Sequence, residues 1–236
     1  MYPSLAIDCS DKVSLIAISD GQKQWQITGT EARNQAKTII SSIDACLTQA
    51  QITKADLKTL CWATGPGSFT GLRIATSVMQ GMSYALNIPL IAVSSLEIMA
   101  ASLVTDIEAD IETILVVSDA RMGELYWAIF EVDQITRKVI RKTSDSLSNL
   151  ETLWDFIQGQ HIAQKAKIAC VGSGGQIISA NKEIESSFVF IESQSKAQSI
   201  FQIAEREIEQ GNQINAMQAR PSYLRSKNAW KTLEQQ

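Results

Sequence analysis

A buried strand that runs through a glycine-rich turn into a long helix limits the folds open to this chain more than any other feature. Residues 57–63 are a predicted buried strand, residues 64–67 read Thr-Gly-Pro-Gly, and residues 68–86 form a predicted helix that ends at Asn87. Strands that alternate with helices are typical of α/β folds. The other predicted strands are residues 5–8, 13–18, 25–28, 90–93, 114–119, 125–132 and 168–171, and the other predicted helices are residues 31–47, 95–100 and 200–208.

The first half of this pattern recurs in the second half of the chain. The opening strand ends in Asp8 and the strand near the middle ends in Asp119, and each leads through a tight turn into a second apolar strand. Such an internal match indicates a duplicated α/β unit and therefore two lobes. We expect a first lobe at residues 1–107, completed by residues 212–236, and a smaller second lobe at residues 108–211.

Composition excludes several kinds of protein. The net charge is −4, so the chain is a poor stand-alone binder of tRNA or DNA, whose phosphates need a basic surface. His161 is the single histidine, which rules out a two-histidine metal site and argues against a serine–histidine catalytic pair. The cysteines form no C-x-x-C pair, and no apolar run is as long as a membrane span, so we expect a reduced, cytoplasmic protein.

The glycine-rich turn is a candidate binding loop. A turn at a helix start presents backbone N–H groups and the positive end of the helix dipole to an anion. Arg73 could add a planar fork for a phosphate or a carboxylate. The alternative is that the glycines only allow a sharp turn and close packing. The candidate ligand or partner loop consists of Gly65, Gly67, Ser68, Phe69, Thr70 and Arg73.

The two strand-end aspartates have two possible roles. Asp8 with Ser10, and Asp119 with Arg121, could hold Mg²⁺ through water and touch the phosphates of a nucleotide. This reading makes the chain an ATP-dependent phosphotransferase or ATPase. The alternative is that each aspartate side chain caps its own turn.

The helix at residues 68–86 is apolar on all sides. Its single charged residue is Arg73, and a helix that is apolar all round is buried on two sides. Together with the helix at residues 31–47 it would form a surface that a partner covers, unless the chain's own second lobe covers it. The predicted partner contacts are Ile39, Ile43, Leu72, Ala75, Met79, Met82 and Leu86.

Four segments together resemble one family. They are Leu-Ala-Ile-Asp at residues 5–8, Gly-Pro-Gly-Ser-Phe-Thr-Gly-Leu-Arg-Ile at 65–74, Asp-Ala-Arg-Met-Gly-Glu at 119–124 and Tyr-Leu-Arg at 223–225. In this order they resemble the TsaB (YeaZ) family. The resemblance extends from end to end of the chain, and the part that matches the family weakly is mainly residues 138–218. The resemblance implies a two-lobed actin/Hsp70-like (ASKHA) fold with duplicated strand–hairpin–helix units. It also implies the dimerisation subunit of the bacterial machinery that installs N6-threonylcarbamoyladenosine (t6A) in tRNA.

The resemblance further implies the partners and the chemistry. The main partner would be the related transferase subunit, TsaD, joined by the ATPase TsaE, with tRNA touched only through the complex and a homodimer in isolation. The transferase carries a His-x-x-x-His metal pair where this chain has Ser95 and Met99, which cannot replace two imidazoles. We therefore expect a subunit with no catalytic residue, no metal and no intrinsic cofactor, with ATP or ADP and Mg²⁺ bound only weakly or at a complex interface.

Two other readings remain open. An independent ATP-dependent enzyme would use Asp8 and Asp119, but Cys9 stands where the family usually has threonine, which removes a hydroxyl from the phosphate turn. The missing histidines argue against a metallopeptidase. The basic, aromatic tail at residues 219–236 either contacts RNA or docks on protein.

Overall fold

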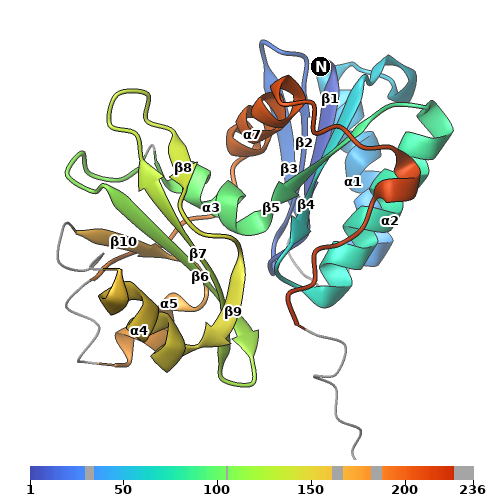
Figure 1. Cartoon of the computed structure of the whole chain (residues 1–236). Coiled ribbons are helices and arrows are strands. Elements are labelled where there is room, and N and C mark those ends of the chain that lie inside the picture. The colour runs from blue at the N-terminus through green and yellow to red at the C-terminus, as the bar shows by residue number, and fades with distance from the viewer. Residues whose placement is uncertain (30–34, 105, 161–166, 182–187, 226–236) are drawn as a thin grey trace, which may run out of the picture.

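The computed structural model describes residues 1–29, 35–104, 106–160, 167–181 and 188–225. Two lobes lie side by side, and each is built on its own β-sheet (Figure 1). Helix α3 (Ser95–Leu103) lies between the two sheets. The predicted α/β class is therefore confirmed.

The first lobe has a five-stranded sheet in the order β3-β2-β1-β4-β5. β1 pairs antiparallel with β2 and parallel with β4. Helices α1 and α2 cover one face of the sheet, and α7 covers the other. The bounds are β1 (Ser4–Asp8), β2 (Ser14–Ser19), β3 (Gln24–Gly29), α1 (Gln35–Ala50), the 3-10 helix η2 (Lys54–Asp56), β4 (Thr59–Gly65), α2 (Phe69–Leu86), β5 (Leu90–Ser94) and α7 (Ala197–Glu209).

The second lobe repeats this topology. Its main sheet has the order β11-β10-β6-β7-β8, so β6 has antiparallel neighbours on one side and parallel neighbours on the other, as β1 does in the first lobe. Helices α4 and α5 cover one face, and α3 covers the other. The bounds are β6 (Thr113–Arg121), β7 (Glu124–Val132), β8 (Val139–Arg141), β9 (Ser146–Asn149), which pairs with β7, α4 (Leu150–Gly159), β10 (Ile168–Val171), α5 (Gly175–Ser179) and β11 (Phe188–Ile191). The predicted duplication is confirmed.

Helix α2 begins and ends at the residues that its sequence predicts. The Ser68 hydroxyl caps the first turn by accepting a hydrogen bond from the Gly71 N–H at 3.3 Å. Asn87 takes the left-handed conformation that ends many helices, with φ of 53°. The inward face packs on the sheet around the fully buried Trp62 of β4.

The lobe boundaries differ from the prediction. Helix α7 was expected in the second lobe, at residues 108–211, but its apolar face packs on the first sheet. Its buried side chains, such as Phe201, join Ala6 and Ile91 in one cluster, and this burial outweighs sequence proximity. The segment at residues 213–225, with the 3-10 helix η4 (Ala216–Gln218), runs along α2 of the first lobe (Figure 1).

The cysteines belong to the core of the protein. All four cysteines are buried free thiols, and burial raises the pKa of Cys9, Cys61 and Cys170 to about 12. They therefore act as small core residues rather than as nucleophiles.

Within the described ranges, every helix is too short or too polar to cross a bilayer.

Candidate functional site

Three backbone amides at and just after the glycine-rich turn are bonded within the chain. The Ser68 N–H donates to the Ser10 carbonyl at 2.7 Å, and the Leu72 N–H donates to the Ser68 carbonyl at 2.9 Å. The Gly71 N–H is taken by the Ser68 hydroxyl. These three groups are not open to an anion, so the turn offers fewer backbone amides than its sequence alone indicates.

The two glycines of the turn serve close packing. Gly65 and Gly67 have φ of +121° and +159°. A Cβ atom on Gly65 would lie 2.9 Å from the Ser222 carbonyl oxygen, and one on Gly67 would collide with the Ser10 carbonyl. The alternative offered by the sequence, glycines for a sharp turn and close contact, therefore describes this loop.

Asp8 is buried and its carboxylate is occupied. Oδ1 accepts hydrogen bonds from the Ser10 N–H at 2.8 Å and from the Ser10 hydroxyl at 2.6 Å. Oδ2 accepts one from the hydroxyl of Ser195, in the segment that leads back from the second lobe, at 2.7 Å. Asp8 caps its own turn and ties it to the returning chain.

Asp119 has the equivalent role in the second lobe. Its Oδ1 accepts the Arg121 N–H at 2.7 Å, and its Oδ2 lies 3.1 Å from the exposed Arg121 guanidinium. Its own N–H donates to the Ser173 hydroxyl at 3.1 Å. Both strand-end aspartates therefore hold turns, as the second reading of the sequence proposes.

Ser95 and Met99, the two positions at which the resemblance implies histidines in the transferase, are part of the packing. The Ser95 hydroxyl donates to the Pro66 carbonyl, and Met99 is 7% exposed in the second-lobe core. Across the described ranges, no group of three or more histidine, cysteine, aspartate or glutamate side chains could hold a metal ion. His161 lies outside the described residues, as do residues 226–236 of the tail.

Most of the predicted partner contacts point inward instead. Five of them are exposed by 3% or less, namely Ile39, Ile43, Leu72, Ala75 and Met79, and all of these except Leu72 belong to the first-lobe core cluster. These side chains are not available to a partner of the folded chain, because the chain's own atoms cover them. Met82 and Leu86 are half-buried at the edge of the same core.

The chain supplies part of the second cover over α2. The Gln80 side-chain amide donates to the Ala216 carbonyl at 2.8 Å, and Ala219 is buried in the first-lobe core. The returning segment thus covers one flank of the helix, which explains why α2 is more apolar than a helix covered on one side.

One row of α2 nevertheless faces outward. Arg73, Ser77, Gly81 and Ala85 follow one another at a spacing of four residues, and all four are exposed. A Cβ atom on Gly81 would meet no atom within 4 Å, so nothing in the described chain requires a glycine in mid-helix. We call these four residues the α2 row. On α1, the neighbouring helix, Ile40 is 50% exposed.

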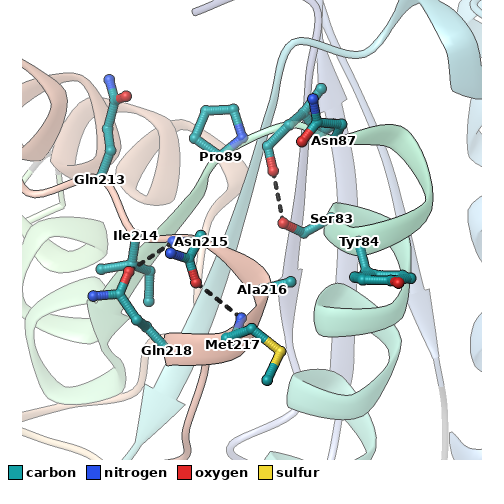
Figure 2. A pocket seen from close by; sticks show the side chains of 11 residues that line it. Ser83, Tyr84, Asn87, Pro89, Gln213, Ile214, Asn215, Ala216, Met217 and Gln218 are labelled. Atoms are coloured by element: carbon teal, nitrogen blue, oxygen red, sulfur yellow. Dashed lines mark hydrogen bonds between the residues drawn. The ribbon is translucent and has the colours of Figure 1, made fainter.

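A groove adjoins the C-terminal end of α2. Figure 2 shows Tyr84 on the helix and Met217 on η4 projecting at its rim, 79% and 75% exposed. The Asn215 side chain accepts from the Met217 N–H at 3.0 Å, and the Gln218 side chain accepts from the Asn215 N–H at 3.0 Å (Figure 2). The eleven lining residues carry no charge, and the cavity volume is about 510 Å³.

An aromatic clamp surrounds the head group of Arg73 at the other end of α2. The guanidinium carbon lies 3.8 Å from the centre of the Phe69 ring and 5.8 Å from that of Tyr223. Its Nε donates to the Tyr223 hydroxyl at 2.8 Å. Sequence reasoning selected Phe69 and Arg73, but the 150-residue separation from Tyr223 concealed the contact.

Beyond Tyr223 the tail reaches the second lobe. The Ser222 N–H donates to the Thr64 carbonyl at 2.8 Å in the first lobe. Arg225 pairs with the Glu124 carboxylate and donates to the Ala120 carbonyl at 3.1 Å in the second. The Tyr-Leu-Arg motif therefore docks on protein at these residues and joins the two lobes.

The two lobes share one sheet topology, and the first strand of each carries an aspartate at or near its end. These features define the actin-like class of two-lobed proteins. A sequence model of the family described as TsaD, tRNA N6-adenosine threonylcarbamoyltransferase, matches residues 29–231. The chain belongs to this family, within its TsaB (YeaZ) branch.

Several relatives support the branch. The chain is 28% identical to the tRNA threonylcarbamoyladenosine biosynthesis protein TsaB of Escherichia coli, over 97% of each protein. It is 26% identical to the protein of the same name from Haemophilus influenzae, over 97% of this chain and 96% of that protein. A Pseudomonas aeruginosa protein described as similar to the peptidase YeaZ has a TM-score of 0.78 and 26% identity, covering 95% of this chain and all of that one.

Proposed function

We propose that this chain is an accessory subunit that binds and activates a TsaD-type transferase for t6A modification of tRNA. The observation that carries the proposal is the near full-length similarity to proteins named for t6A biosynthesis. Ser95 and Met99 are packed inside the chain, and they stand where the resemblance implies the metal-binding histidines of the transferase, which is consistent with a subunit that leaves the chemistry to its partner.

The same proposal includes no catalytic activity and no intrinsic cofactor for the isolated chain. It is supported by the Asp8 carboxylate, both of whose oxygens accept hydrogen bonds within the chain. Mg²⁺ and nucleotide would have to displace the Ser195 hydroxyl before they reached Oδ2.

A thermal-shift experiment tests this part of the proposal. Mg-ATP at about 1 mM, the upper end of common KM values, is expected to leave the melting temperature of the isolated chain unchanged, because a ligand stabilises only the state that binds it. A rise that the Asp8→Asn variant loses would instead favour an independent ATP-dependent enzyme.

We propose that the α2 row is where a helix of the transferase docks. Residues four apart form a ridge that packs into the groove of a second helix. A glycine in the interior of a helix costs about 1 kcal/mol relative to alanine, and at Gly81 the described chain gives no packing reason for that cost. A partner helix in close contact would supply the reason.

Replacing Gly81 by glutamate is the direct test. The new side chain points into open space, so the monomeric chain, at concentrations too low for a homodimer, is expected to keep its free energy of unfolding or to gain up to about 1 kcal/mol. Binding to the transferase is expected to weaken at least about 100-fold, because the contact would have to bury an unpaired charge. Calorimetric titration measures the affinity, and a reconstituted assay measures t6A formation.

Gly159→Glu is the matched control. Gly159 is also helical and exposed, with no atom within 4 Å of an added Cβ, but it lies on α4 of the second lobe. This variant is expected to bind and activate the transferase as the wild type does. Equal affinities for the two glutamate variants would place the interface elsewhere.

Several finer assignments belong to the same proposal. The isolated chain would form a homodimer through the α2 row, since one surface can pair with itself across a two-fold axis. A TsaE-type ATPase would join the complex, tRNA would be contacted only through the complex, and the setting would be the cytoplasm. Light scattering of the Gly81→Glu variant, expected at the monomer mass, tests the homodimer.

A further inference from the structure

We propose that Arg73 binds a carboxylate side chain, an aspartate or a glutamate, of the TsaD-type partner. Phe69 and Tyr223 hold the guanidinium ready for that contact. The inference rests on the proposed function, because it names one chemical contact at one end of the docking surface.

The clamp fixes the head group before any partner arrives. Phe69 stacks at 3.8 Å on the guanidinium carbon, the two aromatic rings lie 5.4 Å apart, and the Tyr223 hydroxyl holds Nε at 2.8 Å. A free arginine side chain has many rotamers and loses that freedom on binding. Because part of that freedom is already lost in the folded chain, binding a ligand to Arg73 costs less conformational entropy.

The other two nitrogen atoms of the guanidinium remain available. Among the residues that the structure describes, no carboxylate lies within 4.0 Å of Arg73, and neither Nη atom makes a hydrogen bond. Arg73 is exposed. Two parallel N–H groups in one plane match the two oxygens of a carboxylate.

The surroundings favour a carboxylate over a phosphate. Phosphate sites at helix starts use several backbone amides in addition to a cation. Here the Ser68 N–H is bonded to Ser10 and the Gly71 N–H to the Ser68 hydroxyl. With these two amides occupied, the charged donor at this end of the helix is the planar fork of Arg73, whose two parallel N–H groups suit a single carboxylate.

The position of Arg73 favours a carboxylate from the partner. Arg73 is the first residue of the α2 row, and Ala85 at its other end is twelve residues further, or about 18 Å along the helix axis. A helix docked on Gly81 and Ser77 would pass over the clamp or end beside it. Arginine is enriched among the residues that dominate binding at protein interfaces.

The test measures the affinity of the full-length chain for the purified TsaD-type transferase by calorimetric titration. Arg73→Glu is expected to weaken binding at least about 100-fold, since it puts two negative groups together. Arg73→Lys, which loses the planar fork, is expected to weaken it about 10-fold, and Tyr223→Phe, which removes only the hydroxyl that holds Nε, about 3-fold. Lys138→Glu makes the same change of charge on the exposed β7–β8 turn and is expected to change nothing.

A second arm identifies the carboxylate. Each surface aspartate and glutamate of the transferase is changed to arginine in turn, and one of these changes is expected to restore binding to the Arg73→Glu chain. Wild-type affinity for Arg73→Glu, while Gly81→Glu fails to bind, would overturn this inference and leave the proposed function intact. If Arg73→Glu kept its affinity for the transferase but abolished binding of ADP by the complex, the ligand would be a phosphate and the inference would also be wrong.

Discussion

Replacing Met79 by glutamate is expected to unfold the first lobe rather than to remove one partner contact. Met79 is fully buried, in the same core cluster as Trp62 and Leu60. The change gives up the burial of a large apolar side chain, about 1.5–3 kcal/mol, and adds the cost of burying a carboxylate. A total of about 4 kcal/mol or more is a large part of the free energy of unfolding of an ordinary domain.

Chemical denaturation followed by circular dichroism measures the effect, and two variants control it. Met79→Leu keeps the volume and is expected to cost less than about 1.5 kcal/mol. Ser77→Glu, two residues earlier but on the exposed row, is expected to leave the fold unchanged. A Met79→Glu chain with wild-type stability would show that this side chain faces outward, as the sequence alone had indicated.

Replacing Glu97 by alanine is expected to destabilise the contact between the lobes. Glu97 on α3 is 5% exposed, and its two oxygens meet Arg206 of α7 at 2.6 Å and Arg141 of β8 at 3.0 Å. One carboxylate thus joins the first lobe to the second. Removing one partner of a buried ion pair costs about 3–5 kcal/mol, and the partial exposure of both arginines reduces the expected loss to about 2–3 kcal/mol.

The same group predicts how stability depends on pH. Burial alone raises the pKa of Glu97, but the hydrogen bond from Arg206 and the charge of Arg141 outweigh it, so the pKa lies below its usual value. A carboxylate whose pKa is lowered in the folded state stabilises the fold fully at pH values above its pKa in the unfolded chain, about 4.3. This stabilisation is lost as the pH falls through the lower pKa of the folded state. The stability difference between wild type and Glu97→Gln is therefore expected to shrink below about pH 4.3.

Denaturation curves from about pH 3 to about pH 7, on both sides of the unfolded-state pKa of about 4.3, provide the measurement. Glu131→Gln, which breaks the exposed pair with Lys142, is expected to change stability by less than about 1 kcal/mol and serves as the control. A loss at Glu97 no larger than the loss at Glu131 would mean that the network does not hold the lobes together.

The sequence predicted α2 closely because its signals are local. Ser68, Asn87 and the glycine turn act through hydrogen bonds within a few residues. Which side of α2 faces the sheet was not predictable in the same way. Met79 and Met82 both belong to its apolar surface, and the segment that covers one flank, at residues 213–219, lies more than 130 residues further along the chain.

The contacts that sequence reasoning missed are long-range for the same reason. Glu97 meets Arg206, and Arg73 meets Tyr223, across more than 100 residues. Helix α4 was also missed, although Asn149 at its start and the spacing of Leu150, Leu153 and Ile157 are local signals that predict it. The outward row was readable in part from Gly81, since a mid-helix glycine calls for a packing reason.

The mass of the species formed when this chain meets a TsaD-type transferase tests the central claim most directly. Light scattering after size exclusion is expected to show a complex that contains both chains, and the Gly81→Glu chain is expected to leave the two apart. If wild-type chain and transferase eluted separately, each at the mass it has alone, the account of this protein as an accessory subunit would be contradicted.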